Sequence, residues 1–243
     1  MVGKRRLNIH SNKIELSMKI GVLLSGCGVY DGAEIQESVL TLLAIEEMGA
    51  EAICISVDEN QYHIVNHLTG EEMPGARNML VEAARIARGK IHEISTISPS
   101  MIDALIIPGG FGSAKNFTKW AFAGPECEIN PKVKLLLVNM INVGKPIVAL
   151  CVSPIIVAKA LQDSKIHTKM TIGTDQEPSP YDITSFVDGL RTSNVETSMK
   201  SVHEIEIDSK NKIITAPCYM MEASILDVRK NIQKALEALK DLI

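Results

Sequence analysis

The sequence contains no long apolar run and no excess of basic residues, and each absence excludes a class of protein. Asp, Glu, Lys or Gly interrupts every hydrophobic stretch before it reaches the roughly 18 residues that a membrane-spanning helix requires. The formal net charge of -4 and the pI near 5.9 leave no basic stripe that would neutralise nucleic-acid phosphates. We therefore expect neither a membrane nor a nucleic acid as a partner.

Paired cysteines are also absent from the sequence. The five cysteines form no C-x-x-C pair, and they stand at positions 27, 54, 127, 151 and 218. An odd number of scattered thiols is typical of a reducing compartment rather than of a disulfide framework. The thiols therefore indicate a cytoplasmic protein, and the mitochondrial matrix is the alternative if the source is eukaryotic.

The N-terminal segment lacks the apolar stretch that a secretory signal needs, although it carries basic side chains. We predict a flexible tail over residues 1–17 and a single domain over residues 18–243. A short organellar transit segment is the alternative for the tail, and Glu15 and the scarcity of serine argue against it.

What the sequence does contain is an alternation of apolar runs and helical patterns. Residues 20–24 form a short apolar run that ends in a Gly-rich turn, as a buried central strand would. Apolar residues recur in helical rhythm over 33–48, with Asp31 placed to cap that helix, and residues 52–57 repeat the strand pattern. A strand, a helix and a strand in this order require a parallel sheet, so the fold class is α/β.

The alternation continues to the C-terminus. Apolar runs and turn residues predict a short strand at 64–65, a helix over 77–88, a strand over 104–107, a helix over 131–143, a strand over 146–150, a helix over 154–161, a strand over 170–173, a loop over 175–201, a hairpin of strands over 202–207 and 212–215, and a helix over 219–242.

Cys151 stands where a predicted strand turns directly into a predicted helix. Such a turn lies at the carboxyl edge of the sheet, where open α/β folds bind ligands. The start of the helix favours a thiolate, and the Val152 N–H with a donor from the Pro108-Gly109-Gly110 turn would stabilise an oxyanion. The pattern therefore indicates a candidate nucleophile, and a buried small hydrophobe is the alternative that it leaves open.

Several long motifs carry a resemblance to a known family. They are SGCGVYDGAEIQE over 25–37 and PGGFGSAKN over 108–116, joined by 146–154, 171–175 and 216–220. Over 19–243 the sequence resembles ElbB-type proteins, a branch of the class I glutamine amidotransferase-like (PfpI) superfamily. The resemblance implies a flavodoxin-like three-layer sandwich with a mostly parallel sheet and helices on both faces, and a homodimer.

The resemblance also implies a set of site residues. In the superfamily the cysteine pairs with a glutamate early in the first helix, and Glu37 holds that position, with Glu34 as the competing assignment. The predicted oxyanion donors are Gly110 and Val152. The residues predicted to line the pocket are Cys27, Gly109, Lys115 and Asn116.

A histidine that would complete a glutaminase triad has no clear counterpart in this sequence. His167 falls in a linker, and His203 lies on a predicted strand that faces away from the pocket, so glutaminase activity is not expected. His63 and His67 lie in predicted strand and loop rather than on one helix face, so no metal is expected.

The function that the resemblance implies is a glyoxalase-type lyase acting on a small carbonyl substrate. Cys151 would add to glyoxal or methylglyoxal and Glu37 would move the proton, with no cofactor. A non-catalytic or redox-sensing protein is the alternative, since the histidine is missing. A deglycase-type hydrolase using the same thiol is a further alternative.

Overall fold

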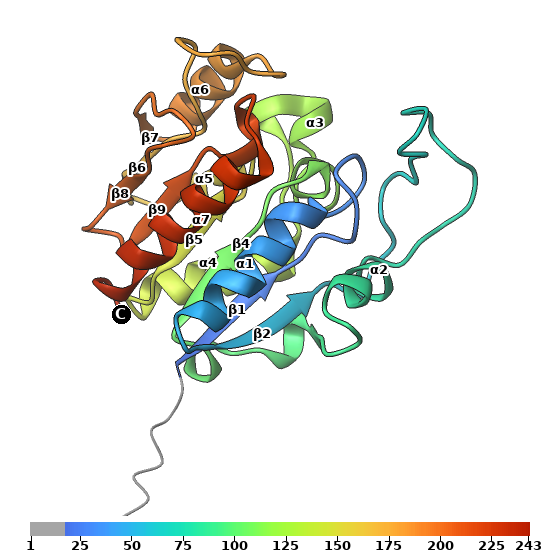
Figure 1. The fold of residues 1–243 in the computed structure, drawn as a ribbon, viewed down its shortest axis with the longest axis horizontal. Helices are drawn as coiled ribbons and strands as arrows, with labels where there is room; N and C mark the ends of the chain where they lie inside the picture. The colour runs from blue at the N-terminus through green and yellow to red at the C-terminus, as the bar shows by residue number, and fades with distance from the viewer. Residues whose placement is uncertain (1–17) are drawn as a thin grey trace, which may run out of the picture.

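A seven-stranded sheet runs through the computed structural model, which describes residues 18–243 (Figure 1). The predicted tail over 1–17 lies outside the described residues. The strand order is β3-β2-β1-β4-β5-β9-β8, and only β8 runs antiparallel to its neighbour. The strands are β1 (Lys19–Leu23), β2 (Glu51–Ser56), β3 (His92–Glu93), β4 (Ala104–Ile107), β5 (Ile147–Leu150), β8 (Glu206–Asp208) and β9 (Ile213–Ala216).

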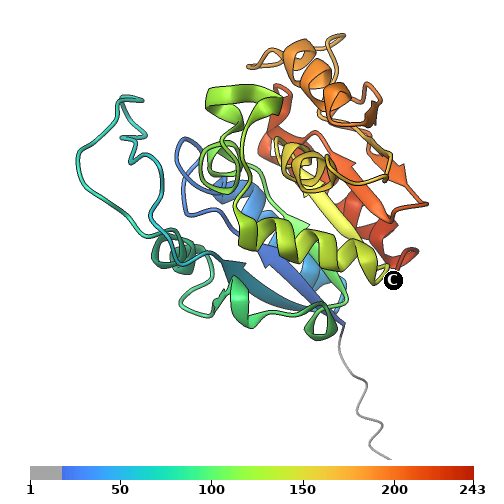
Figure 2. The same ribbon diagram turned by 180° about the vertical axis from the view of Figure 1, so that it is seen from behind.

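Helices cover both faces of this sheet. Figure 1 shows α1 and α7 in front of the strands, and Figure 2, the view from behind, shows α4 and α5 on the opposite face of the sheet. This arrangement confirms the flavodoxin-like three-layer sandwich with a mostly parallel sheet. The helices are α1 (Ile35–Glu47), α2 (Met79–Ile86), α3 (Trp120–Ala123), α4 (Pro131–Asn142), α5 (Pro154–Leu161), α6 (Ile183–Thr192) and α7 (Ile225–Lys240). No helix within residues 18–243 is long and apolar enough to cross a membrane.

The core lies along the three adjacent strands β4, β5 and β9. Every residue of β4, β5 and β9 is buried, because helices close both faces of a parallel sheet and leave its strands no polar side. All eight residues of α5 are buried as well. The helix that follows β5 is thus fixed on all sides, and so is the turn between the two elements.

Helix α1 begins later than its predicted cap. Glu34, in an extended conformation, is the N-cap, and its side chain accepts from the backbone N–H of Glu37. Asp31 is instead buried, and its Oδ2 accepts from the N–H of Val65 at 2.8 Å. The prediction of Asp31 as the cap is therefore wrong, because this carboxylate anchors the long loop after β2.

That loop replaces the strand predicted at 64–65. Val65 forms only an isolated bridge with Glu72, and residues 57–78 extend away from the body of the protein in both views (Figures 1 and 2). Within the described chain, Ile64 and Val65 have no neighbouring strand with which to form a β-ladder.

The loop predicted over 175–201 is wrong, because it contains α6 and β7 (Val195–Thr197). Asp182 caps α6 by accepting from the N–H of Ser185 at 3.0 Å. The apolar residues Ile183, Val187 and Leu190 form its buried side. The prolines that suggested a loop precede the helix, and β7 pairs with β6 (Thr168–Met170) in a second, two-stranded sheet.

The C-terminal part keeps the predicted hairpin but shortens the last helix. Asp208 pairs with Ile213 in an antiparallel ladder, which confirms the hairpin. Helix α7 begins only at Ile225, because Ser224 and Asp227 form a capping box there. The residues before it form a short 3-10 turn over Cys218–Met220.

Candidate active site

Cys151 lies on the turn between β5 and α5. Its φ of 56° is in the left-handed region, which a side-chain-bearing residue adopts only when its surroundings hold it there. The Cys151 N–H donates to the carbonyl of Ala216 at 2.8 Å, and the Ser153 hydroxyl donates to the carbonyl of Pro108 at 2.8 Å. The neighbouring strands thus fix the turn that presents the sulfur.

Glu37 lies beside Cys151 and is completely buried. Its Oε2 accepts from the Gly109 N–H at 2.8 Å, and its Oε1 accepts from the Tyr219 N–H at 3.2 Å. A Cβ on Gly109 would lie 2.7 Å from both Cys151 Sγ and Glu37 Oε2, so these atoms lie within twice that distance of each other. The structure therefore brings the predicted thiol and carboxylate together and holds the carboxylate by two backbone donors.

The Glu37 carboxyl and the Cys151 thiol each affect the pKa of the other. Burial, followed by the charge of Glu34, raises the pKa of Glu37 to about 7. Burial, followed by the charge of Glu37, raises the pKa of the Cys151 thiol well above its ordinary value. Near neutral pH the pair therefore holds the thiol proton next to a carboxylate that can accept it.

The expectation that the start of α5 would produce a thiolate is corrected by these shifts. A helix terminus contributes about 0.3–1 kcal/mol at a partly exposed site. Removing an anion from water costs several kcal/mol when no cation accompanies it. Burial is therefore the larger effect, and Cys151 needs a base in order to react.

The buried Glu37 makes stability depend on pH. Its pKa of about 7 lies above the ordinary 4.5, so the folded state binds this proton more tightly than the unfolded state does. This stabilisation is complete below 4.5 and is lost as the pH rises through 7, which amounts to about 3 kcal/mol. Urea denaturation at pH 5 and pH 8 should show this loss in the wild type.

The Glu37→Gln variant is the control for this pH dependence. Other carboxyl groups titrate in both proteins, so the difference between the two isolates residue 37. We expect the free energy of unfolding of the variant to fall by roughly 2–3 kcal/mol less than that of the wild type between pH 5 and pH 8. Equal pH dependence would contradict the raised pKa of Glu37.

Gly109 permits the close approach of the pair. A Cβ at this position would lie 2.4 Å from the Cβ of Cys151 and within 3 Å of Glu37 Oε2. We expect Gly109→Ala to destabilise the protein by roughly 1–3 kcal/mol through overpacking and to displace the thiol from the carboxylate. Gly144→Ala is the control for the alkylation rate alone, since a Cβ there meets open space, although its φ of 69° costs stability in any residue with a side chain. Thermal unfolding and the alkylation rate of Cys151 measure both effects, and a normal alkylation rate in Gly109→Ala would contradict this packing.

A narrow hollow opens over the sulfur. Its empty volume, including the opening to solvent, is about 330 Å³. Gly110, Cys151 and Val152 contribute to its lining, as does Glu34. Aromatic side chains form much of the wall and are Phe111, Tyr181, Phe186 and Tyr219.

The predicted oxyanion donors both line this hollow. The Gly110 N–H has no hydrogen-bond partner within residues 18–243. The Val152 N–H bonds to the sulfur of Cys151 and lowers the thiol's pKa, against the larger effect of burial. The Gly109 N–H already binds Glu37 and the Val152 N–H bonds to the thiol, so the Gly110 N–H is the one of these three donors without a partner in the described residues.

No family model matches the chain, but curated relatives do. The human glutamine amidotransferase-like class 1 domain-containing protein 3, mitochondrial, is 36% identical over 225 residues, which are 91% of this chain and 82% of the relative. The rat ES1 protein homolog, mitochondrial, is 34% identical over 242 residues, which are 98% of this chain and 89% of the relative. The chain belongs to the ES1 family of glutamine amidotransferase-like class 1 domain proteins.

A solved structure supports the same assignment. The isoprenoid biosynthesis protein with an amidotransferase-like domain from Ehrlichia chaffeensis matches with a TM-score of 0.83 at 32% identity, over 93% of this chain and 99% of that chain. The resemblance to ElbB-type proteins inferred from the sequence motifs is confirmed.

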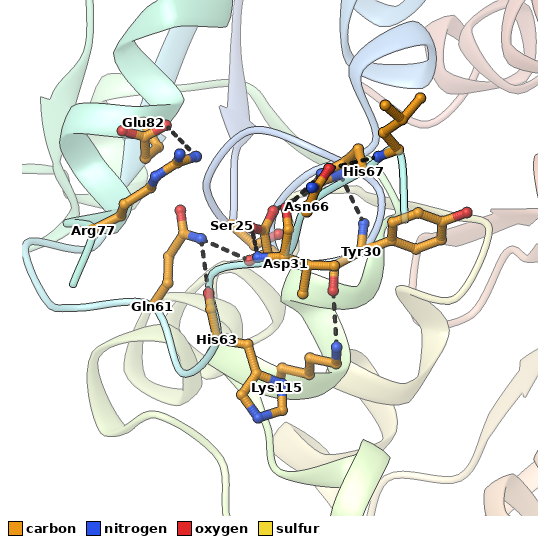
Figure 3. A network of polar contacts seen from close by, with 12 residues as sticks. Ser25, Tyr30, Asp31, Gln61, His63, Asn66, His67, Arg77, Glu82 and Lys115 are labelled. Carbon is orange, nitrogen blue, oxygen red and sulfur yellow. Dashed lines mark hydrogen bonds and ion pairs between the residues drawn. The ribbon is translucent and has the colours of Figure 1, made fainter. Parts of the chain in front are cut away.

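None of the four residues predicted to line the pocket lines the hollow in this ES1-family chain. The Lys115 ammonium donates to the carbonyl of Tyr30 at 2.9 Å, as Figure 3 shows, and lies over the Phe111 ring outside the hollow. The amide NH₂ of Asn116 donates to the carbonyls of Ser25 and Asp31. Both belong to a π-helical turn over Ser113–Phe117, which directs Asn116 into the protein.

Cys27 is the third corrected prediction. Its thiol does not line the hollow. Burial and then the charge of Glu82 raise its pKa, which places the thiol toward α2. The end of β1 is near the same sheet edge as Cys151, but the following turn directs Cys27 elsewhere. Gly109 does not line the hollow either, but its backbone lies against both Cys151 and Glu37.

No histidine within residues 18–243 lines the hollow of the ES1-family chain. His167 and His203 are both exposed. Tyr181 and Phe186 were not predicted as site residues, because they belong to the segment predicted to be a loop. The signal was present as Asp182 followed by apolar residues at helical spacing, which is typical of a capped amphipathic helix. The Tyr181 hydroxyl has no hydrogen-bond partner within the described chain, and burial raises its pKa to about 12.

Proposed function

We propose that this ES1-family chain is a cofactor-independent glyoxalase-like enzyme that converts glyoxal and methylglyoxal into hydroxy acids. The observation that carries the proposal is the contact of a protonated thiol with a buried carboxylate whose pKa is about 7. A base that is half ionised near neutral pH can both accept and return a proton. The narrow hollow suits a substrate of a few heavy atoms.

The first step is the addition of the thiol to the aldehyde. The Cys151 sulfur forms a bond to the aldehyde carbon while its proton moves to the Glu37 carboxylate, and the carbonyl electron pair becomes an alkoxide. The N–H groups of Gly110 and Val152 would stabilise that oxygen. Glu37 then returns the proton to the alkoxide, which gives a hemithioacetal and restores the carboxylate.

The second step moves a hydrogen between adjacent carbons. Glu37 removes the C–H proton of the hemithioacetal carbon, and the electron pair forms an enediolate with the neighbouring carbonyl. Glu37 returns the proton to that neighbouring carbon while the hemithioacetal hydroxyl passes its proton to the neighbouring oxygen, which gives a thioester of a 2-hydroxy acid. One carbon is oxidised and the other reduced, so no external redox cofactor is required. Water then cleaves the thioester and frees the thiol.

Product analysis tests this reaction directly. We expect the protein to convert glyoxal into glycolate and methylglyoxal into lactate, as followed by proton NMR with no added cofactor. Disappearance of the dicarbonyl without formation of a hydroxy acid would contradict the reaction. Such a result would be simple adduct formation with lysine or arginine side chains.

A redox-sensing role is the second candidate, because no histidine of the described residues lines the hollow. Mild peroxide would then convert Cys151 to a sulfenic or sulfinic acid in a protein that turns over no dicarbonyl. A deglycase-type hydrolase would use the same thiol. A release rate from glycated amines that exceeds the rate of their spontaneous dissociation would distinguish it.

We also propose a homodimer, from the family resemblance, and a mitochondrial location. The human and rat relatives carry the word mitochondrial in their names. Analytical ultracentrifugation should give twice the mass of the 26.5 kDa chain.

A further inference from the structure

The hollow over Cys151 contains a carboxylate and no basic side chain. Glu34 lines both the narrow hollow and a wider groove that shares Tyr181 and Tyr219 with it. Glu222 adds a second carboxylate to that groove. No lysine, arginine or histidine of residues 18–243 lines either part. A ligand on its way to the sulfur therefore meets negative charge between aromatic walls.

The position of the Glu34 side chain is fixed by the start of α1. Its Oε2 accepts from the Glu37 N–H at 2.6 Å. Burial raises the pKa of Glu34, and the backbone N–H groups of Glu37, Gln36 and Ile35 oppose that rise. These donors and the positive end of the helix support the ionised form. The charge is therefore held at a fixed place rather than on a freely rotating side chain.

A cation near the rim does not cancel this charge. The Lys115 ammonium donates to the carbonyl of Tyr30 (Figure 3) and lines a separate groove that shares Phe111 and Tyr181 with the hollow. The carboxylates that act on this ammonium are those of Asp31 and Glu72, not that of Glu34. The aromatic faces of Tyr181 and Tyr219 are compatible with uncharged and cationic groups and give no compensation to an anion.

We propose that Glu34 is a charge filter that restricts the site to uncharged or cationic carbonyl compounds and excludes carboxylates such as 2-oxo acids. Like charges placed against a ligand are an established means of rejecting it. The consequence for turnover rests on the proposed function: the hydroxy-acid product is an anion, and Glu34 would speed its release. The filter itself is independent of the reaction.

Alkylation of Cys151 by reagents that differ in charge tests the filter without any turnover. Iodoacetamide is neutral and iodoacetate is an anion of similar size, and peptide mass analysis reports the modification of Cys151 alone. We expect the iodoacetamide to iodoacetate rate ratio to exceed that of N-acetylcysteine by about tenfold. Glu34→Gln, which keeps an oxygen for the cap, should bring the ratio close to that of N-acetylcysteine.

The matched control is Glu237→Gln, an exposed residue of α7 that makes the same change in net charge. It should leave the ratio as in the wild type. In the wild type, added salt should increase the rate of Cys151 alkylation by iodoacetate but not the rate by iodoacetamide. This measurement needs no variant, so it does not depend on whether a variant folds.

Three results would overturn the filter: an unchanged ratio in Glu34→Gln, a wild-type ratio equal to that of N-acetylcysteine, or no alkylation of Cys151 by either reagent. A protein that shows the filter but produces no hydroxy acid would contradict the glyoxalase proposal alone.

Discussion

Replacing Cys151 by serine is expected to lower the rate of hydroxy-acid formation by about 10³-fold or more, to the level of the buffer. Serine fits the same volume, but its hydroxyl is a far weaker acid than a thiol. A carboxylate with a pKa of about 7 would not deprotonate it during attack. The left-handed turn and the hydrogen bond from the residue 151 N–H to Ala216 remain, so the fold is retained.

Cys54→Ser is the matched control for this result. Cys54 is also a buried cysteine, but it lies on β2 and does not line the hollow. The rate of glycolate formation from glyoxal should stay within about twofold of the wild type in this variant, provided that circular dichroism shows it folded. Full activity of Cys151→Ser would exclude the sulfur as the nucleophile.

Replacing Glu37 by glutamine is expected to lower the same rate by about 10²–10⁴-fold, the usual contribution of a positioned acid or base. Glutamine can still accept one of the backbone N–H groups of Gly109 and Tyr219, so the helix should stay in place. What it removes is the group that takes the thiol proton.

The pH profile distinguishes this chemical role from a structural one. The wild-type rate should rise with pH through about 7, because the carboxylate is the active form. The residual rate of Glu37→Gln should lack that rise. Glu46→Gln, on the exposed side of the same helix, should behave as the wild type. A preserved rise near pH 7 in Glu37→Gln would assign the titration to another group.

The elements that the sequence predicted well combine an apolar run with clear turn residues. The strand over Ala104–Ile107 and the helix over Pro154–Leu161 have the predicted bounds. Their signal is local, since burial on both faces of a parallel sheet leaves a continuous apolar run. The placement of Cys151 at the end of β5 follows from the same pattern.

The incorrect predictions concern polar side chains whose hydrogen-bond partners lie far away in the sequence. Asp31 had the position of a helix cap but anchors Val65 instead. Asn116 followed a Gly-rich turn at the site, yet its amide bonds to Ser25 and Asp31. No local pattern distinguishes such choices, because each depends on which loop the fold brings nearby.

The aromatic wall was missed for a related reason. Tyr181 and Phe186 belong to a segment whose prolines and serines are typical of a loop, and the capped helix within it is short. Only the fold places this segment over the sheet edge. The choice of Glu37 over Glu34, in contrast, agrees with the contacts of both residues, since Glu37 reaches Cys151 and Glu34 caps the helix.

The pH dependence of Cys151 alkylation by iodoacetamide tests most directly whether this sulfur is both reachable and coupled to Glu37. In the wild type the rate should rise to a plateau with a midpoint near pH 7, because loss of the shared proton from the pair creates the reactive form. In Glu37→Gln that rise should move above pH 9, as burial alone then governs the thiol. A sulfur that stays unmodified up to pH 9, or one midpoint for both proteins, would contradict the account.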